Sequence, residues 1–206
     1  MIYLGIDPAK SSGYALLDGP HGKDAVRLAS GVIRFSERES YYRQIVRVLR
    51  GLPAAPEVVC IESPVLYFET DERGRKVPRN LMGYRTHAGI MALWIDAVFE
   101  VFHLRAEIVM PSEWQSSIFR GMGMGSTKAK SDRFCRQKYG YTPEDDNEAD
   151  ALCIAFWMHT RYGFTLRVTG DTPKDRIKAA INRSILRKGG DPMVLQILEE
   201  KEKKSQ

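Results

Sequence analysis

The chain has 206 residues, of which 43% are hydrophobic and 28% are charged, and this length suits one folded domain with an appendage. No apolar run reaches the roughly eighteen residues of a membrane span. The start of the chain lacks the basic and apolar regions of a secretory signal. The three cysteines include no C-x-x-C pair, which argues against a disulfide framework or a thiolate zinc site. We therefore expect a protein of the reducing cytoplasm with no membrane partner.

The net charge is unevenly distributed. Residues 161–206 hold 11 Lys and Arg against 6 Asp and Glu, which accounts for the whole excess of +5. A basic appendage on a neutral body indicates a polyanionic partner. We predict a body domain over residues 1–162 and a basic helical extension over residues 163–206, with helices at about 173–188 and 192–203.

Hydrophobic periodicity predicts an α/β domain. Strands are expected over residues 2–6, 13–17, 28–35, 58–61 and 107–110. Helices are expected over residues 41–49, 81–102, 128–139 and 145–157, with a short helix capped by Ser112 and a polar, basic loop over residues 64–80. The first three strands are joined too closely for crossover helices and should be antiparallel, whereas the helix before the fourth strand makes that strand parallel. The result is a mixed five-stranded sheet with helices on both faces.

Acidic residues close two of the predicted strands. Asp7 ends the first strand and Glu62 ends the fourth. If these strands are neighbours, both carboxylates emerge from the same end of the sheet. Asp146 and Asp150 lie one turn apart on the last helix of the body and share a face. The sequence therefore predicts one pocket that holds four carboxylates.

Clustered carboxylates repel one another and raise each other's pKa values. A divalent hard cation removes this cost, and Mg²⁺ is held by carboxylates, water and phosphate oxygens. Two such ions can activate a water and stabilise the leaving oxygen during phosphodiester cleavage. Any single acid could instead cap a turn or a helix start. Asp145 and Glu148 fit that structural role best, as a helix cap and its capping-box partner.

These motifs resemble those of a known family. GIDPAKSSGYALLD is similar to the opening strand-turn-strand of RuvC-type Holliday-junction resolvases, a branch of the ribonuclease H-like nucleases. VVCIESP resembles the second acidic motif of that family, and DNEADALCIAF resembles the third. The resemblance follows the order of elements over about residues 1–160. It implies a ribonuclease H-like fold, a homodimer, and a metal-dependent endodeoxyribonuclease that makes paired nicks across a four-way DNA junction.

The resemblance also implies two Mg²⁺ ions per site, with Mn²⁺ as a substitute, and a bacterial cell or phage-infected host as the setting. Carried over residue by residue, Asp7 matches the first acid, Glu62 the second and Asp150 the last. Bacterial members usually have an acid or a histidine three residues before the last acid, where this chain has Asn147. Asp146 is the nearest carboxylate on the same helix face, so we expect it to be the fourth ligand, with Asn147 as the alternative.

Two segments carry candidate DNA contacts. Lys128 and Lys130 follow a glycine-rich loop, where basic side chains suit phosphate contacts, and the family has a lysine in this region that supports catalysis. In the loop over residues 64–80, aromatic side chains beside basic ones can stack on unpaired bases, and the family uses an aromatic here to disturb base pairing. The residues concerned in this loop are Tyr67, Phe68, Arg73, Arg75 and Lys76. A solvated or packed surface explains each of these positions equally well.

Two other classes of protein compete with a junction nuclease. One is a ribonuclease H-like protein that binds or processes nucleic acid without cutting junctions, and Asn147 is its main support. The other is a nucleotide-binding relative of the actin and sugar-kinase group, which also opens with a Gly-Ile-Asp strand. That group needs a second phosphate loop of the Asp-x-Gly type, which this sequence lacks. The four histidines have no ligand spacing, and we predict no role for them.

Overall fold

The computed structural model describes residues 1–19 and 24–167. The chain divides into two units, Met1–Arg161 and Tyr162–Gln206, and the elements described below lie in the first of them, except that the last helix continues to Arg167. The helices predicted at about 173–188 and 192–203 lie outside the described residues, and the domain boundary after residue 162 stays a prediction. Within the described part of the chain, no helix combines the length and apolar character of a membrane span.

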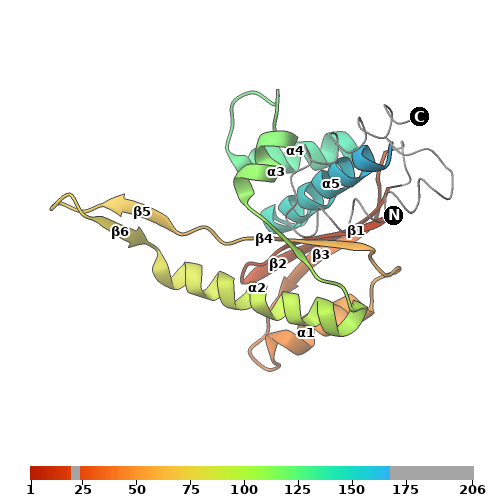
Figure 1. Ribbon diagram of the computed structural model, residues 1–206, viewed down its shortest axis with the longest axis horizontal. Coiled ribbons are helices and arrows are strands. Elements are labelled where there is room, and N and C mark those ends of the chain that lie inside the picture. Colours follow the sequence, from red (N-terminus) through yellow and green to blue (C-terminus); the bar gives the residue numbers. More distant parts are fainter. Residues whose placement is uncertain (20–23, 168–206) are drawn as a thin grey trace, which may run out of the picture. The chain divides into compact units, whose positions relative to one another are not determined.

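The first unit is built on a mixed five-stranded sheet, as predicted (Figure 1). Its strands are β1 (Ile2–Asp7), β2 (Ser11–Asp18), β3 (Val26–Arg34), β4 (Val58–Glu62) and β7 (Glu107–Val109), in the spatial order β3-β2-β1-β4-β7. β1, β2 and β3 pair antiparallel, while β4 pairs parallel with both β1 and β7. This order makes β1 and β4 neighbours at the centre of the sheet.

Helices cover both faces of the sheet (Figure 1). They are α1 (Tyr41–Arg50), α2 (Leu81–Phe102), α3 (Pro111–Ile118), α4 (Thr127–Tyr139) and α5 (Asp146–Arg167). Alternate residues of the strands serve the two faces: Leu16 of β2 belongs to the core formed with α1 and α2, whereas Ala15 and Leu17 belong to the core formed with α4 and α5. The sheet is therefore buried on both sides.

α5 lies directly against β1 and β2 because glycines remove the side chains that would separate them. A Cβ atom on Gly13 would lie 1.9 Å from the carbonyl oxygen of Asn147, and one on Gly5 would lie 2.3 Å from the carbonyl oxygen of Ala151. Gly13 is also the cross-strand partner of Asp7. The first turn of α5 is thus held beside the end of β1.

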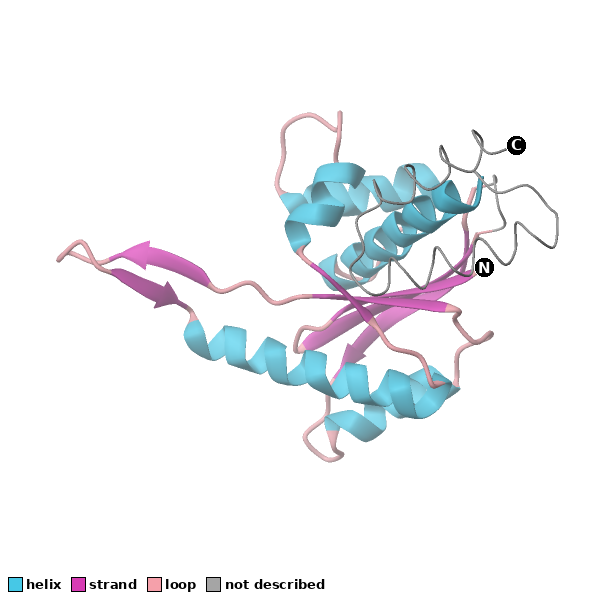
Figure 2. Cartoon of the chain, in the orientation of Figure 1, coloured by secondary structure: helices cyan, strands magenta, loops and turns pink. Residues whose placement is uncertain are grey.

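Residues 64–80, predicted as a loop, contain two strands instead. β5 (Tyr67–Thr70) and β6 (Lys76–Arg79) form a separate antiparallel hairpin that leads into the N-terminal end of α2 (Figure 2). Asp71 organises the turn, since its Oδ1 accepts hydrogen bonds from the backbone N–H groups of Arg73 and Arg75. Gly74 supplies the positive φ of 75° that the turn requires. The loop prediction was wrong because every residue of β5 is exposed, so no apolar alternation marks the strand.

The start of α3 also differs from the prediction. The helix begins at Pro111, and the side chain of Glu113 accepts a hydrogen bond of 2.8 Å from the backbone N–H of Met110. Proline suits the first helical position because the missing N–H would have no partner there. The cap predicted at Ser112 was therefore placed too late in the chain.

We expect the substitution Gly13→Ala to lower the free energy of unfolding by about 1–3 kcal/mol, because the new methyl group must displace the backbone of α5. Gly89→Ala is the matched control, since no atom lies within 4 Å of the position of its Cβ. At that helical site alanine should raise stability by about 0.5–1 kcal/mol. Urea denaturation measures both changes, and equal effects of the two substitutions would contradict the close packing of α5.

Candidate active site

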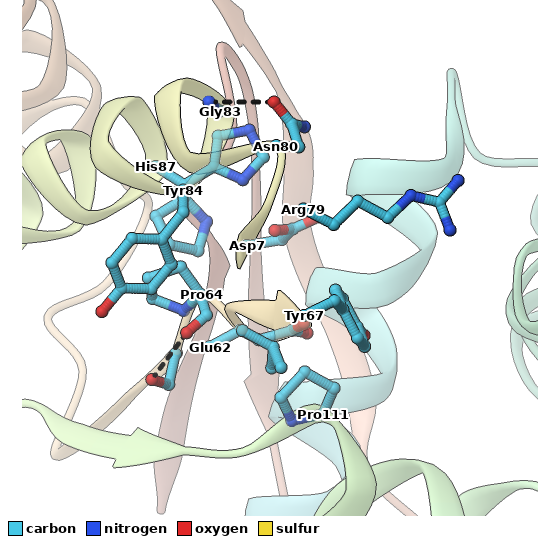
Figure 3. A pocket seen from close by; sticks show the side chains of 13 residues that line it. Asp7, Glu62, Pro64, Tyr67, Arg79, Asn80, Gly83, Tyr84, His87 and Pro111 are labelled. Atoms are coloured by element: carbon cyan, nitrogen blue, oxygen red, sulfur yellow. Dashed lines mark hydrogen bonds between the residues drawn. The ribbon is translucent and has the colours of Figure 1, made fainter. Parts of the chain in front are cut away.

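Asp7 and Glu62 lie at the same edge of the sheet, as predicted. β1 and β4 are parallel neighbours, and Ile6 is paired in register with Ile61. Each acid follows directly after this pair of residues, so the two side chains leave adjacent strands at one level. Both are half-buried, and both line the same pocket (Figure 3).

The two acids of α5 belong to the same electrostatic cluster. Burial raises the pKa of Asp7 well above its ordinary value, and the negative charges of Glu62, Asp150 and Asp146 raise this pKa further, in that order. Asp7 therefore lies within electrostatic reach of the other three carboxylates that the sequence singled out, and of Asp145 as well. Asp146 takes part in this cluster although it stands four residues before Asp150.

Three of the four acids each have a separate hydrogen-bond or ion-pair partner. The indole N–H of Trp114, a fully buried residue of α3, donates a 2.9 Å hydrogen bond to Oε2 of Glu62. The hydroxyl of Ser131, fully buried on α4, donates to Oδ1 of Asp150. The ammonium group of Lys128 forms an ion pair with Asp146, and 72% of the lysine side chain is exposed.

These surroundings set the protonation of the acids in the metal-free protein. Burial and then the charge of Asp150 raise the pKa of Glu62 to about 8, against the opposing effect of the hydrogen bond from Trp114. Burial raises the pKa of Asp150 to about 6, although the hydrogen bond from Ser131 favours its charged form. Near neutral pH, Glu62 therefore holds a proton most of the time, and a bound cation would displace that proton by favouring the charged carboxylate.

The donor set suits a hard divalent cation, because carboxylate oxygens are the ligands that Mg²⁺ and Mn²⁺ prefer. Among the described residues, no three Asp, Glu, His or Cys side chains already converge as a ligand set. The side chains of Glu62, Asp150 and Asp146 are instead directed at their separate partners. The residues present fit an ion in chemistry and location, and Asp146 would have to leave Lys128 in order to reach it.

Asp145 has the structural role predicted for it, whereas Glu148 has a structural role that differs from the predicted capping box. Oδ1 of Asp145 accepts hydrogen bonds of 3.0 Å from the backbone N–H groups of Asn147 and Glu148, which caps α5. Glu148 is fully buried and accepts hydrogen bonds from the hydroxyls of Ser30 and Tyr141. Its other oxygen accepts from the backbone N–H of Glu144, one residue earlier than a capping box would use.

The candidate DNA contacts fall in different places. Lys128 lies beside the acids, and Lys130 is half-buried on the same helix. Tyr67 and Phe68 are 64% and 60% exposed, and as neighbours in a strand they point to opposite faces of the hairpin. Arg73 and Lys76 are exposed near the turn, while Arg75 forms a 2.9 Å ion pair with Asp71. Of these seven residues, only Tyr67 lines the pocket beside Asp7 and Glu62.

The pocket, of about 240 Å³, is lined by Asp7 and Glu62 but not by Asp146 or Asp150. The prediction of one pocket with four carboxylates was therefore wrong, and sequence reasoning missed the other walls of the pocket. The base of the hairpin and the first turns of α2 form its far wall (Figure 3). Its lining includes Arg79, Asn80, Tyr84 and His87, of which the histidine had been given no role. Trp114 and Ser131 were missed as well. No sequence signal identifies these residues, since their positions depend on how α2, α3 and α4 pack around the strand ends.

Comparisons with known proteins detect the fold and no close relative. No family model and no curated protein matches the chain. Among solved structures, Thermus thermophilus RuvC in complex with Holliday junction substrate matches with a TM-score of 0.59 at 19% identity, over 79% of this chain and 97% of that chain. A second Thermus thermophilus RuvC structure matches with a TM-score of 0.57 at 20% identity, over the same shares of 79% and 97%.

The yeast mitochondrial Holliday junction resolvase Ydc2 matches with a TM-score of 0.52 at 12% identity, over 78% of this chain and 80% of that chain. At these identities the similarity establishes the fold alone. The protein has the ribonuclease H-like fold of RuvC-type resolvases, which confirms the resemblance seen in the sequence motifs.

We expect the free energy of unfolding of the metal-free protein to fall as the pH rises from about 5 to about 8. The folded state binds the proton of Glu62 more tightly than the unfolded state, since folding raises the pKa of this group from 4.5 to about 8. The stability that this proton contributes is fully present below the unfolded-state pKa of 4.5, and it is lost as the pH rises through the folded-state pKa of about 8. The effect should be on the order of a few kcal/mol.

Denaturation in EDTA at a series of pH values measures this slope. Glu62→Gln should remove most of it, because the amide does not titrate. Glu69→Gln, on the exposed face of the hairpin, should leave it unchanged. A Glu62→Gln variant with the wild-type slope would show that another group carries the pH dependence.

Proposed function

We propose that the protein is a structure-selective DNA endonuclease that resolves four-way junctions and other branched DNA by hydrolysing phosphodiester bonds, with paired symmetric nicks. The observation that carries this proposal is the cluster of four carboxylates from β1, β4 and α5. The fold supports it, since Thermus thermophilus RuvC has the same fold and has been observed with a Holliday junction substrate.

Asp7, Glu62, Asp146 and Asp150 would hold two Mg²⁺ ions, for which Mn²⁺ would substitute. Such ions, when bound, activate a water and stabilise the leaving oxygen of a phosphodiester. Trp114 and Ser131 orient two of the ligands through buried hydrogen bonds. Lys128 would release Asp146 and contact the DNA phosphate instead, a role that its exposed, flexible side chain suits.

The remaining DNA contacts follow from the hairpin and α4. Phe68 presents an exposed ring on the same hairpin as the exposed basic residues Arg73, Arg75 and Lys76, and such a combination can stack on an unpaired base and bind the adjoining backbone. Lys130 lies on α4 within one turn of Lys128 and would contact the same strand. Because Arg75 is paired with Asp71, we expect Arg73 and Lys76 to contribute more to affinity.

We also propose a homodimer with two active sites, because a four-way junction is roughly two-fold symmetric and must be cut twice. The supporting surface lies on α2, where Ala88, Ala92, Ile95 and Phe99 form an apolar stripe at helical spacing. Phe99 is 56% exposed, and the two alanines allow another helix to approach closely.

For location, the cytoplasm of a bacterial cell or of a phage-infected host stays our prediction, supported by three free, buried cysteines.

A protein that binds branched nucleic acid without cutting it is the second candidate. Two observations favour it: Asn147 replaces an acid, and Asp146 is paired with Lys128 instead of facing a shared ion site. Both candidates predict junction binding, so cleavage in the presence of Mg²⁺ distinguishes them.

We expect Asp7→Asn to reduce nicking of a four-way junction by several orders of magnitude while junction binding persists, because the amide keeps the shape and removes a metal-bridging charge. Asp132→Asn is the control, since that acid pairs with Arg136 on the outside of α4. Gel assays of cleavage and of binding measure the two effects separately. Full nicking activity in Asp7→Asn would refute the proposed site.

We expect Asp146→Asn to abolish cleavage almost as completely as Asp150→Asn, and Asn147→Ala to cost less, because a neutral carbonyl oxygen is a weaker ligand than a carboxylate. Glu148→Gln should instead lower stability by about 1–3 kcal/mol, since it disturbs a buried acceptor of three hydrogen bonds. Cleavage rates and urea denaturation separate these outcomes. Normal cutting by Asp146→Asn together with an inactive but stable Glu148→Gln would show that the acids of α5 have been assigned wrongly.

A further inference from the structure

The segment between α3 and α4 takes no part in the acid cluster. It reads Gly-Met-Gly-Met-Gly over residues 121–125, and we call it the methionine loop. Met124 is 96% exposed, more than any other large hydrophobic side chain among the described residues. One exposed apolar residue is ordinary on a protein surface, and it is the surroundings of Met124 that give it a use.

The backbone of the methionine loop holds Met124 away from the core. The backbone N–H of Met122 donates a 3.1 Å hydrogen bond to the carbonyl oxygen of Phe119. The guanidinium group of Arg133 donates another, also of 3.1 Å, to the carbonyl oxygen of Met122. The three glycines have positive φ angles, a conformation that other residues rarely adopt. The loop is thus tied down at Met122 and extends beyond the two helices (Figure 1).

Basic side chains frame the methionine loop. Arg120 precedes it, Lys128 and Arg133 follow it, and all three are exposed. Residues 119–131 contain no Asp or Glu, so the frame attracts a polyanion. An apolar side chain inside such a frame suits a ligand that combines phosphates with apolar surface. DNA meets this description through its backbone and the faces of its bases.

The methionine loop also lies close to the acids along the chain. Lys128, four residues after Met124, forms the ion pair with Asp146. Four residues of extended chain span at most about 14 Å, and bases in a duplex follow one another at about 3.4 Å. Met124 can therefore reach a base step within about four steps of a phosphate that Lys128 contacts.

We propose that Met124 inserts between neighbouring bases close to the branch point of a DNA junction and opens that base step. Apolar side chains, methionine among them, act as wedges that partly unstack bases and kink the duplex. A branch point is the favourable place, because its stacking is already interrupted. The unbranched, polarizable side chain of methionine adapts to such an irregular gap. The proposal rests on the proposed function and adds a contact that phosphate-binding residues cannot supply.

Junction affinity tests the apolar contact. Binding is measured in the Asp7→Asn chain, which should bind junctions without cutting them. Met124→Gln keeps the length of the side chain and makes it polar, so it should weaken binding by about tenfold. Met124→Leu keeps the apolar volume and should stay within about threefold of the starting affinity. Val26→Ala is the control, since Val26 is another exposed apolar residue, 58% exposed on β3, and it should leave binding unchanged.

Salt dependence distinguishes the wedge from a phosphate contact. Lys128→Ala should reduce the slope of log K against log salt by about one, because one fewer phosphate is neutralised. Met124→Gln should lower the affinity equally at every salt concentration, since an apolar contact releases no counterions. A change of slope in Met124→Gln would show that the loop acts through phosphate contacts and would overturn the wedge.

A fluorescent base tests the unstacking directly. 2-Aminopurine, whose emission rises when its stacking is lost, is placed in turn at each position flanking the branch point. Binding of the Asp7→Asn chain should raise the emission at least about twofold at one or two positions. Met124→Gln should remove most of this rise and Met124→Leu should keep it. A merely structural role of the loop would not produce a response confined to particular bases.

The outcomes separate the wedge from the nuclease. Unchanged affinity and unchanged emission in Met124→Gln would overturn the wedge and leave the nuclease proposal standing. Loss of self-association in Met124→Gln, measured by sedimentation without DNA, would show that Met124 contacts a second copy of the chain, which would also overturn the wedge. Unstacking that depends on Met124, in a chain that never cuts junctions with Mg²⁺ or Mn²⁺, would overturn the proposed function and support the wedge.

Discussion

Electrostatic repulsion among four carboxylates is the constraint around which the first unit is arranged. Two of these acids are fixed by the parallel register of β1 and β4. The other two approach because Gly5 and Gly13 allow α5 to lie directly on the strands. Backbone packing thus forces like charges together, and partial burial prevents water from screening them. Donors from two further helices, α3 and α4, oppose the repulsion.

Those donors are of two kinds, and the difference has a functional consequence. Trp114 and Ser131 are fully buried neutral groups that fix the directions of Glu62 and Asp150. Lys128 is an exposed cation at the start of α4, after a loop whose glycines adopt positive φ angles. Two of the acids are therefore held in place by the core, whereas the partner of Asp146 is an exposed side chain. A site arranged in this way could replace the ammonium group of Lys128 with metal ions without unfolding.

The sequence was sufficient for features that depend on local pattern, and insufficient for those that depend on packing. Asp7 and Glu62 could be predicted because each closes a short apolar run, and the lengths of the connections fixed how the strands pair. Trp114 could not, because its indole reaches Glu62 only after β7 has placed α3 beside β4. The hairpin was not predicted because strands that are exposed on both faces show no hydrophobic alternation. Asp71 and Gly74 are turn residues, but no recognisable strands flanked them in the sequence.

The acids lie at the strand ends, whereas basic residues lie near the turn of the hairpin. This separation would allow an acidic site to act on a polyanion. Under the proposed function, the carboxylate cluster would repel phosphate, so DNA would have to be attracted elsewhere and then brought to the acids. Arg73 and Lys76 near the turn of the hairpin would supply such attraction, since basic groups dominate affinity for the backbone and accelerate encounter. The base of the same hairpin forms a wall of the pocket at Asp7. Because one pair of strands spans both regions, a DNA strand bound near the turn would be directed toward the acids, where a bound cation would neutralise the remaining repulsion.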